Sequence, residues 1–120
     1  MILGIDEIHR LVDEAKLVEN LSERELNEPE GAGVDLRIGE LYELSGTGFL
    51  GTKERKTPKA RLIARHNLRK IVKVTLKPKR YYTMTTVEEV NTPANIVILF
   101  RPRSTLYRSG VTLFTGNCAP

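Results

Sequence analysis

The N-terminal part of the chain carries a helical pattern of apolar positions. These positions recur at spacings of three and four residues: Ile5, Ile8, Leu11, Val12 and Ala15. Such spacing places the apolar side chains on one face of a helix. The pattern therefore predicts a helix over about residues 6–18. Residues 20–30 are polar and acidic and lead into Gly31-Ala32-Gly33, so we expect a loop there.

From residue 34 onward, several segments carry the patterns of strands: apolar and polar residues alternate over residues 34–44 and 72–76, and β-branched and aromatic residues are enriched over residues 81–87. Residues 34–39 and 41–44 form paired strands or one bulged strand in this interpretation. Residues 45–58 contain three glycines and a charged run, which indicates a surface loop or a hairpin tip. Further strands are expected over residues 60–64, 71–76, 81–87, 95–100 and 111–115. The pattern as a whole predicts a mainly β fold, a barrel or sandwich preceded by one α-helix.

Size and composition indicate one globular domain over residues 1–120, because 120 residues are enough for one core and too few for two. No apolar run approaches the roughly 20 residues of a membrane helix, and the first residues lack the basic region of a secretory signal. We therefore expect a cytoplasmic protein without a membrane partner. The single cysteine, Cys118, excludes an internal disulfide and a zinc site built from cysteines.

The net charge of +4 suits an anionic ligand. Most basic residues lie in residues 53–59 and 61–80, in sequence typical of loops and strands, without the interleaved aromatic residues common on nucleic-acid surfaces. They indicate a solvated face, and no nucleic-acid partner is expected. Glutamine and tryptophan are absent and 28% of the residues are charged, which hints at a thermophile source.

The most concentrated chemistry lies in residues 101–110, which hold three arginines and four hydroxyl-bearing residues directly after an apolar run. Guanidinium groups donate two parallel hydrogen bonds to anionic oxygens, and hydroxyls donate single short ones. If residues 103–108 form a turn or a short helix, Arg103, Ser104 and Arg108 can converge on one anion. The alternative is a basic surface turn whose arginines extend into water.

Asp35 is a second candidate, because its carboxylate lies two residues after Gly33 and in an expected strand. A carboxylate held in this way can meet a cation or a sugar hydroxyl. The alternative is a salt bridge with Arg37 on the same strand face.

Three segments together resemble the superfamily of deoxyuridine triphosphatases and dCTP deaminases, with archaeal triphosphatase-like members the most similar. Residues 33–39 (GVDLRIG) are similar to its Gly-x-Asp-Leu motif. Lys77-Pro78, Tyr82, Glu88 and Pro93 match a run of proline, aromatic, glutamate and proline. Residues 103–111 (RSTLYRSGV) are similar to its Arg-Ser-Ser-Leu-x-Arg-x-Gly segment, with Thr105 in place of the second serine.

This resemblance implies a distorted β-barrel or jelly roll that assembles as a homotrimer, with nucleotide sites at the subunit boundaries. It implies that Arg103 and Ser104 bind a triphosphate and that Arg108 lies near the phosphates or the reacting water. Thr105 and Asn117 join this nucleotide-binding set. Asp35 would lie near Mg²⁺ and contact it through water. The implied reaction is hydrolysis of dUTP to dUMP and pyrophosphate, and the alternative is deamination of dCTP.

The end of the sequence departs from the family pattern. Ala119 stands where the resemblance places an aspartate that orients the attacking water, and the catalytic glutamate of the deaminases would fall beyond Pro120. No catalytic residue is therefore assigned. We expect a chain cut short at its C-terminus; the alternatives are an engineered substitution and a natural relative that binds nucleotides without hydrolysing them.

Overall fold

The computed structural model describes residues 1–120, except for the side chain of Asn117. The chain forms two compact units, which are described separately. The first contains Met1–Gly33 and Val90–Pro120, and the second contains Val34–Glu89.

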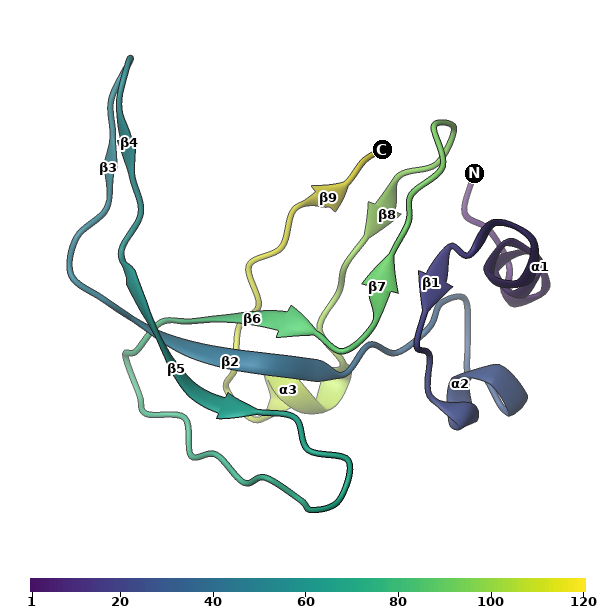
Figure 1. The fold of residues 1–120 in the computed structure, drawn as a ribbon, viewed down its shortest axis with the longest axis horizontal. Coiled ribbons are helices and arrows are strands. Elements are labelled where there is room, and N and C mark those ends of the chain that lie inside the picture. The colour runs from purple at the N-terminus through teal and green to yellow at the C-terminus, as the bar shows by residue number, and fades with distance from the viewer. The chain divides into compact units, whose positions relative to one another are not determined.

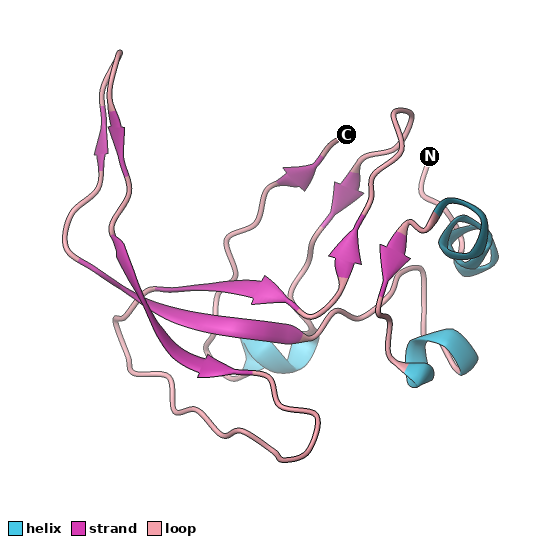
Figure 2. Ribbon diagram, in the orientation of Figure 1, coloured by secondary structure: helices cyan, strands magenta, loops and turns pink.

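The second unit is organised around β2 (Ile38–Ser45), the central strand of a three-stranded antiparallel sheet (Figures 1 and 2). Its neighbours are β5 (Lys59–Arg65) and β6 (Tyr82–Thr86). The register shifts between Leu41 and Tyr42 against β5, and between Ile38 and Glu40 against β6. The bulged-strand alternative is therefore confirmed, although the strand begins at Ile38 and not at residue 34 as expected.

A hairpin connects β2 to β5, as the glycine-rich segment predicted. It consists of β3 (Phe49–Leu50) and β4 (Arg55–Lys56), which pair antiparallel. In Figure 1 the hairpin bends away from the direction of β2 and projects beyond the sheet. The amide N of Gly51 donates to the carbonyl O of Glu54 over 2.8 Å and closes its tip.

The prediction of a strand over residues 71–76 is wrong. Residues 71–76 have no assigned secondary structure, Val72, Val74 and Leu76 are each about two-fifths exposed, and no described strand pairs with the segment. Alternation of apolar residues records which side chains face an apolar surface. A strand also needs a neighbour for its backbone N–H and C=O groups, and alternation does not supply one.

The first unit begins with α1 (Ile5–Ala15), which confirms the helix predicted from the apolar stripe. The helix ends earlier than expected because Lys16 adopts a left-handed conformation with φ of 50°, and the amide N of Leu17 then donates to the carbonyl O of Leu11. Val18 belongs instead to a short strand, β1 (Val18–Glu19). Leu17 and Val18 are the buried apolar residues of the described chain.

A second helix, α2 (Glu23–Asn27), lies in the segment that was expected to be a loop. Ser22 caps it by accepting a hydrogen bond from the amide N of Glu25 over 3.4 Å. The order serine, two residues, glutamate is a known signal for a helix start. The ring nitrogen Nε2 of His9 lies 3.0 Å from the carbonyl O of Glu25, which joins α2 to α1.

The C-terminal part of the first unit contains β8 (Ile98–Leu99), α3 (Ser104–Arg108) and β9 (Asn117–Cys118), and β7 (Glu89–Val90) lies at the boundary of the units. Strands β8 and β9 pair antiparallel. The strand expected over residues 95–100 is thus reduced to two residues. The strand expected over residues 111–115 is wrong, because the pairing with β8 falls on β9 instead.

The described residues therefore form a mainly β chain with small antiparallel sheets and three helices, where the sequence predicted one helix. They contain no closed barrel, so the barrel or jelly roll stays a prediction. None of the described helices is long and apolar enough to span a membrane.

Candidate functional site

Residues 103–108 were expected to form a turn or a short helix, and the structure shows the helix, α3. Arg103 is the N-cap residue of α3, with extended backbone angles, and the helix covers Ser104–Arg108. Gly110 ends it in a left-handed conformation with φ of 77°, which glycine adopts without strain. The amide N of Val111 then donates to the carbonyl O of Leu106 over 3.0 Å and fixes the turn.

The four predicted anion-binding residues of this segment, Arg103, Ser104, Thr105 and Arg108, are all exposed. Ser109 has a structural role, because its hydroxyl donates to the carbonyl O of Thr105 over 2.7 Å. The structure thus gathers two guanidinium groups and two hydroxyls on one short helix and its N-cap and leaves them accessible to a ligand. These groups can donate several charge-assisted hydrogen bonds to a polyphosphate.

A carboxylate lies near this group, which the sequence did not reveal. Oε2 of Glu30 is 4.0 Å from Nη2 of Arg103, and Oε1 of the same residue accepts from Nη2 of Arg24 over 2.8 Å. The side chains of Glu30 and Arg103 are 72% and 52% exposed, so water screens this pair strongly. An anionic ligand can compete with Glu30 for Arg103 at small cost.

Asp35 lies in the second unit, half-buried in the segment that leads into β2. Its neighbour Arg37 pairs with Glu88: Nε of Arg37 lies 2.7 Å from Oε1 of Glu88, and the amide N of Arg37 donates to Oε2 over 2.8 Å. Asp35 and residues 103–108 belong to different units.

The side chain of Asn117 lies outside the described residues, so its predicted role in nucleotide binding stays a prediction. Its neighbour Cys118 is half-buried, and the hydroxyl of Thr92 donates to Sγ of Cys118 over 3.3 Å. Ala119 is exposed, and its methyl group can neither accept a proton nor hold a water. No catalytic base is therefore assigned at this position.

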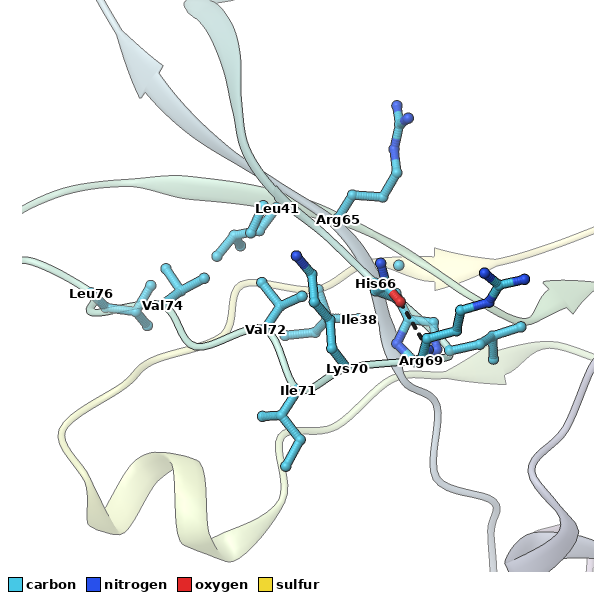
Figure 3. Close-up of a pocket in the computed structure, with 14 residues that line it drawn as sticks. Ile38, Leu41, Arg65, His66, Arg69, Lys70, Ile71, Val72, Val74 and Leu76 are labelled. Carbon is cyan, nitrogen blue, oxygen red and sulfur yellow. Dashed lines mark hydrogen bonds between the residues drawn. The ribbon is translucent and has the colours of Figure 1, made fainter.

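A groove of about 660 Å³ in the second unit was not predicted. It lies between the sheet and residues 66–76 (Figure 3). Val72 and Val74 point toward the sheet, whereas Ile71 points to the opposite side. Its lining combines apolar side chains with Arg65, His66, Arg69 and Lys70. The alternation in residues 71–76 indicated that Val72, Val74 and Leu76 face one side. It did not indicate that the segment would stay unpaired and leave a groove beside the sheet.

The chain belongs to the dCTP deaminase-like family, whose sequence model matches residues 2–120. It is 32% identical over 85 residues to a probable deoxyuridine 5'-triphosphate nucleotidohydrolase of Methanopyrus kandleri, covering 70% of this chain and 53% of that protein. It is 34% identical over 114 residues to a dCTP deaminase of Pyrobaculum neutrophilum, covering 94% of this chain and 62% of that protein. The superfamily inferred from the three motifs is confirmed.

The chain spans between about half and three-fifths of the length of these curated relatives. A comparison with solved structures finds no match.

Proposed function

We propose that the chain binds a deoxynucleoside triphosphate and belongs to an enzyme that hydrolyses dUTP to dUMP and pyrophosphate. The observation that carries this proposal is the exposure of Arg103, the N-cap of α3, and of Ser104 and Arg108 on the helix, which leaves their donors accessible to an anion. The similarity to the nucleotidohydrolase of Methanopyrus kandleri supports dUTP as the substrate.

In the proposed mechanism, Arg103 and Ser104 bind the triphosphate, and Thr105 and Asn117 complete the contacts to the nucleotide. Arg108 lies near the phosphates or the attacking water. Water attacks the α-phosphorus and pyrophosphate leaves, while the guanidinium groups stabilise the negative charge that develops on the phosphate oxygens. These donors are charged before the reaction starts and need little rearrangement.

Mg²⁺ is proposed as the metal because its ligand preference fits the residues present. The described residues contain no group of three or more His, Cys, Asp or Glu side chains able to hold a metal by themselves. Mg²⁺ usually keeps several waters and binds through one or two carboxylates together with the phosphates of the substrate. Asp35 would hold the ion through water together with the phosphates, and the metal would supply neutralisation of the triphosphate charge.

A homotrimer with nucleotide sites at the subunit boundaries is part of this proposal. It is supported by large apolar side chains that the chain leaves exposed: Phe49, Leu50, Leu68, Ile71 and Phe114. Burying such side chains in an interface is favourable by about 25 cal/mol per Å². In a trimer, Asp35 of one subunit can contribute to a site that contains the α3 cluster of a neighbour.

Deamination of dCTP is the second candidate activity. It is favoured by the two Pyrobaculum dCTP deaminases, from P. neutrophilum and P. islandicum, since each alignment covers 94% of this chain. A third candidate is a nucleotide-binding protein without turnover, which Ala119 favours because no carboxylate is present there.

The test is incubation of the chain with dUTP and Mg²⁺, followed by measurement of pyrophosphate, with a parallel dCTP reaction assayed for ammonia. Pyrophosphate from dUTP is the expected result. Ammonia from dCTP without pyrophosphate would assign the chain to the deaminases. Calorimetric binding of dUTP without either product would assign it to the binding proteins.

A further inference from the structure

Glu88 carries a carboxylate that is completely buried, and the proposed function gives it no part. Its side chain is 0% exposed. Each of its oxygens meets a different donor of the same residue, since Oε1 lies 2.7 Å from Nε of Arg37 and Oε2 accepts from the amide N of Arg37 over 2.8 Å. A buried charge is tolerated when it is paired and hydrogen-bonded in this way.

A third hydrogen bond to Arg37 comes from the residue next to Glu88. The amide N of Val87 donates to the carbonyl O of Arg37 over 2.9 Å, and the hydroxyl of Thr86 donates to the carbonyl O of Glu88 over 2.7 Å. Both backbone groups of Arg37 and its guanidinium are thus fixed by residues 87 and 88. We call this arrangement the Glu88 corner.

The Glu88 corner lies just before β2, next to the Asp35 segment. Strand β2 begins only at Ile38, which pairs with Thr86, so the ladder of β2 and β6 does not include residues 34–37. The hydrogen bonds to Arg37 therefore anchor the backbone two residues from Asp35. Because a backbone held at one residue restricts its neighbours, the corner limits the positions that the Asp35 carboxylate can take.

We propose that Glu88 is a positioning residue, which fixes Arg37 and thereby orients Asp35 toward a metal bound to the triphosphate. This inference rests on the proposed function, because it needs Asp35 to face Mg²⁺. Residues that hydrogen-bond directly to a metal ligand commonly affect metal affinity about 10–100-fold although they do not touch the ion. Glu88 acts one residue further away, through Arg37, so an effect at the lower end of this range is expected. A purely structural ion pair would affect folding and leave the metal dependence of nucleotide binding unchanged.

The first test compares the chain with its Glu88→Gln variant by amide hydrogen exchange. The amide oxygen of glutamine can still accept from one donor, but its NH₂ group cannot accept from the other, so the charged pair with Arg37 is lost. Circular dichroism of the variant checks that the fold is retained. Faster exchange over residues 34–37 is expected. Glu43→Gln is the matched control, because Glu43 pairs with Arg61 over 2.7 Å on the same sheet. Equal exchange in both variants would overturn the proposal.

The second test measures the affinity for dUTP by calorimetry with and without Mg²⁺. We expect Glu88→Gln to weaken binding about tenfold in Mg²⁺ and much less without it. In an Asp35→Asn background the same change should have no further effect, since Glu88 acts through Asp35. An additive loss in that background would overturn the proposal. Arg37→Lys, which keeps the charge but removes the Nε donor, serves as a second variant.

The outcomes separate this inference from the proposed function. If the chain binds dUTP in Mg²⁺ and Glu88→Gln binds it equally well, Glu88 is not a positioning residue, and the proposed function stands. If the unaltered chain binds no dUTP in Mg²⁺, the proposed function fails and this inference fails with it.

Discussion

Gly39 and Thr86 approach each other so closely that a β-carbon built on Gly39 would lie 2.7 Å from the carbonyl O of Thr86. The neighbouring carbonyl carbon of Thr86 and the amide N of Val87 would lie at 2.9 and 3.0 Å. All three atoms belong to the backbone at the end of β6, so they cannot rotate away as the tip of a side chain can. Glycine at this position permits the register shift of β2 against β6 between Ile38 and Glu40.

We expect Gly39→Ala to lower the free energy of unfolding by about 1–3 kcal/mol, the usual cost of overpacking. Urea denaturation followed by circular dichroism measures it. Gly116→Ala is the control, because a β-carbon there meets no atom within 4 Å and Gly116 has no positive φ. Equal stability of the two variants would contradict the close approach in the sheet.

Removal of the Glu88 carboxylate should also destabilise the chain. We expect Glu88→Ala to cost about 3 kcal/mol, at the lower end of the range for breaking a buried ion pair, because the side chain of Arg37 is 35% exposed. Glu43→Ala should cost less than about 1 kcal/mol, since its partner Arg61 is 72% exposed. The two variants are compared by urea denaturation. A Glu88→Ala variant as stable as Glu43→Ala would show that the pair contributes little.

The sequence predicted the helices and strands whose local residue pattern is enough to specify them. The apolar stripe specified α1, alternation specified the bulged β2, and β-branched and aromatic residues specified β6. A strand was also expected over residues 60–64, where β5 lies. The same alternation in residues 71–76 gave a wrong strand, because pairing depends on a neighbour elsewhere in the chain. Helix α2 was missed although Ser22 and Glu25 carry a helix-start signal.

The candidate site was predictable to a similar extent. Residues 103–108 could be singled out as a candidate because charge and hydroxyl groups are dense in one short segment, and their role in binding stays a prediction. The pairing of Arg37 with Glu88 could not, because it joins residues 51 positions apart and depends on how β2 meets β6. The family motif singled out Glu88, but nothing in the sequence indicated that Glu88 is buried and the adjacent Glu89 exposed.

Arg103→Ala should weaken dUTP binding by about 1.5–3 kcal/mol, the range for hydrogen bonds to charged groups. Isothermal calorimetry in Mg²⁺ measures the difference. Arg55→Ala is the control, because it removes the same charge from the exposed β4 strand of the hairpin and tests for a general electrostatic effect. Equal losses in both variants would mean that net charge, and not a site at α3, attracts the nucleotide.

A pH dependence is expected from Glu40 and Tyr42, which lie on the same face of β2. The Tyr42 hydroxyl donates to Oε2 of Glu40, and Nε of Arg65 donates to Oε1 over 2.8 Å. The hydrogen bond from Tyr42, followed by the one from Arg65, lowers the pKa of Glu40. The bond to Glu40 in turn raises the pKa of Tyr42.

The two shifts predict losses of stability at opposite ends of the pH range. The contribution of Glu40 is present above its unfolded pKa of about 4.3 and is lost as the pH falls through its lower folded pKa. The contribution of Tyr42 is present below about pH 10 and is lost as the pH rises through its raised folded pKa. Tyr42→Phe should weaken both dependences in urea denaturation across this range. An unchanged acid and alkaline profile would argue against the bond.

Ala119→Asp tests whether the absence of a carboxylate limits turnover. If the chain binds dUTP at the α3 cluster, an aspartate at this exposed position can accept a proton from the attacking water, and general base catalysis typically contributes about 10²–10⁴-fold. We expect pyrophosphate release to rise in Ala119→Asp and not in Ala119→Asn, which has the same shape but cannot act as a base. Neither change touches Arg103, so Ala119→Asn should keep its dUTP affinity, whereas Ala119→Asp should bind dUTP somewhat more weakly because the new carboxylate repels the triphosphate. Tight binding with no gain in pyrophosphate would favour a protein that binds the nucleotide without hydrolysing it.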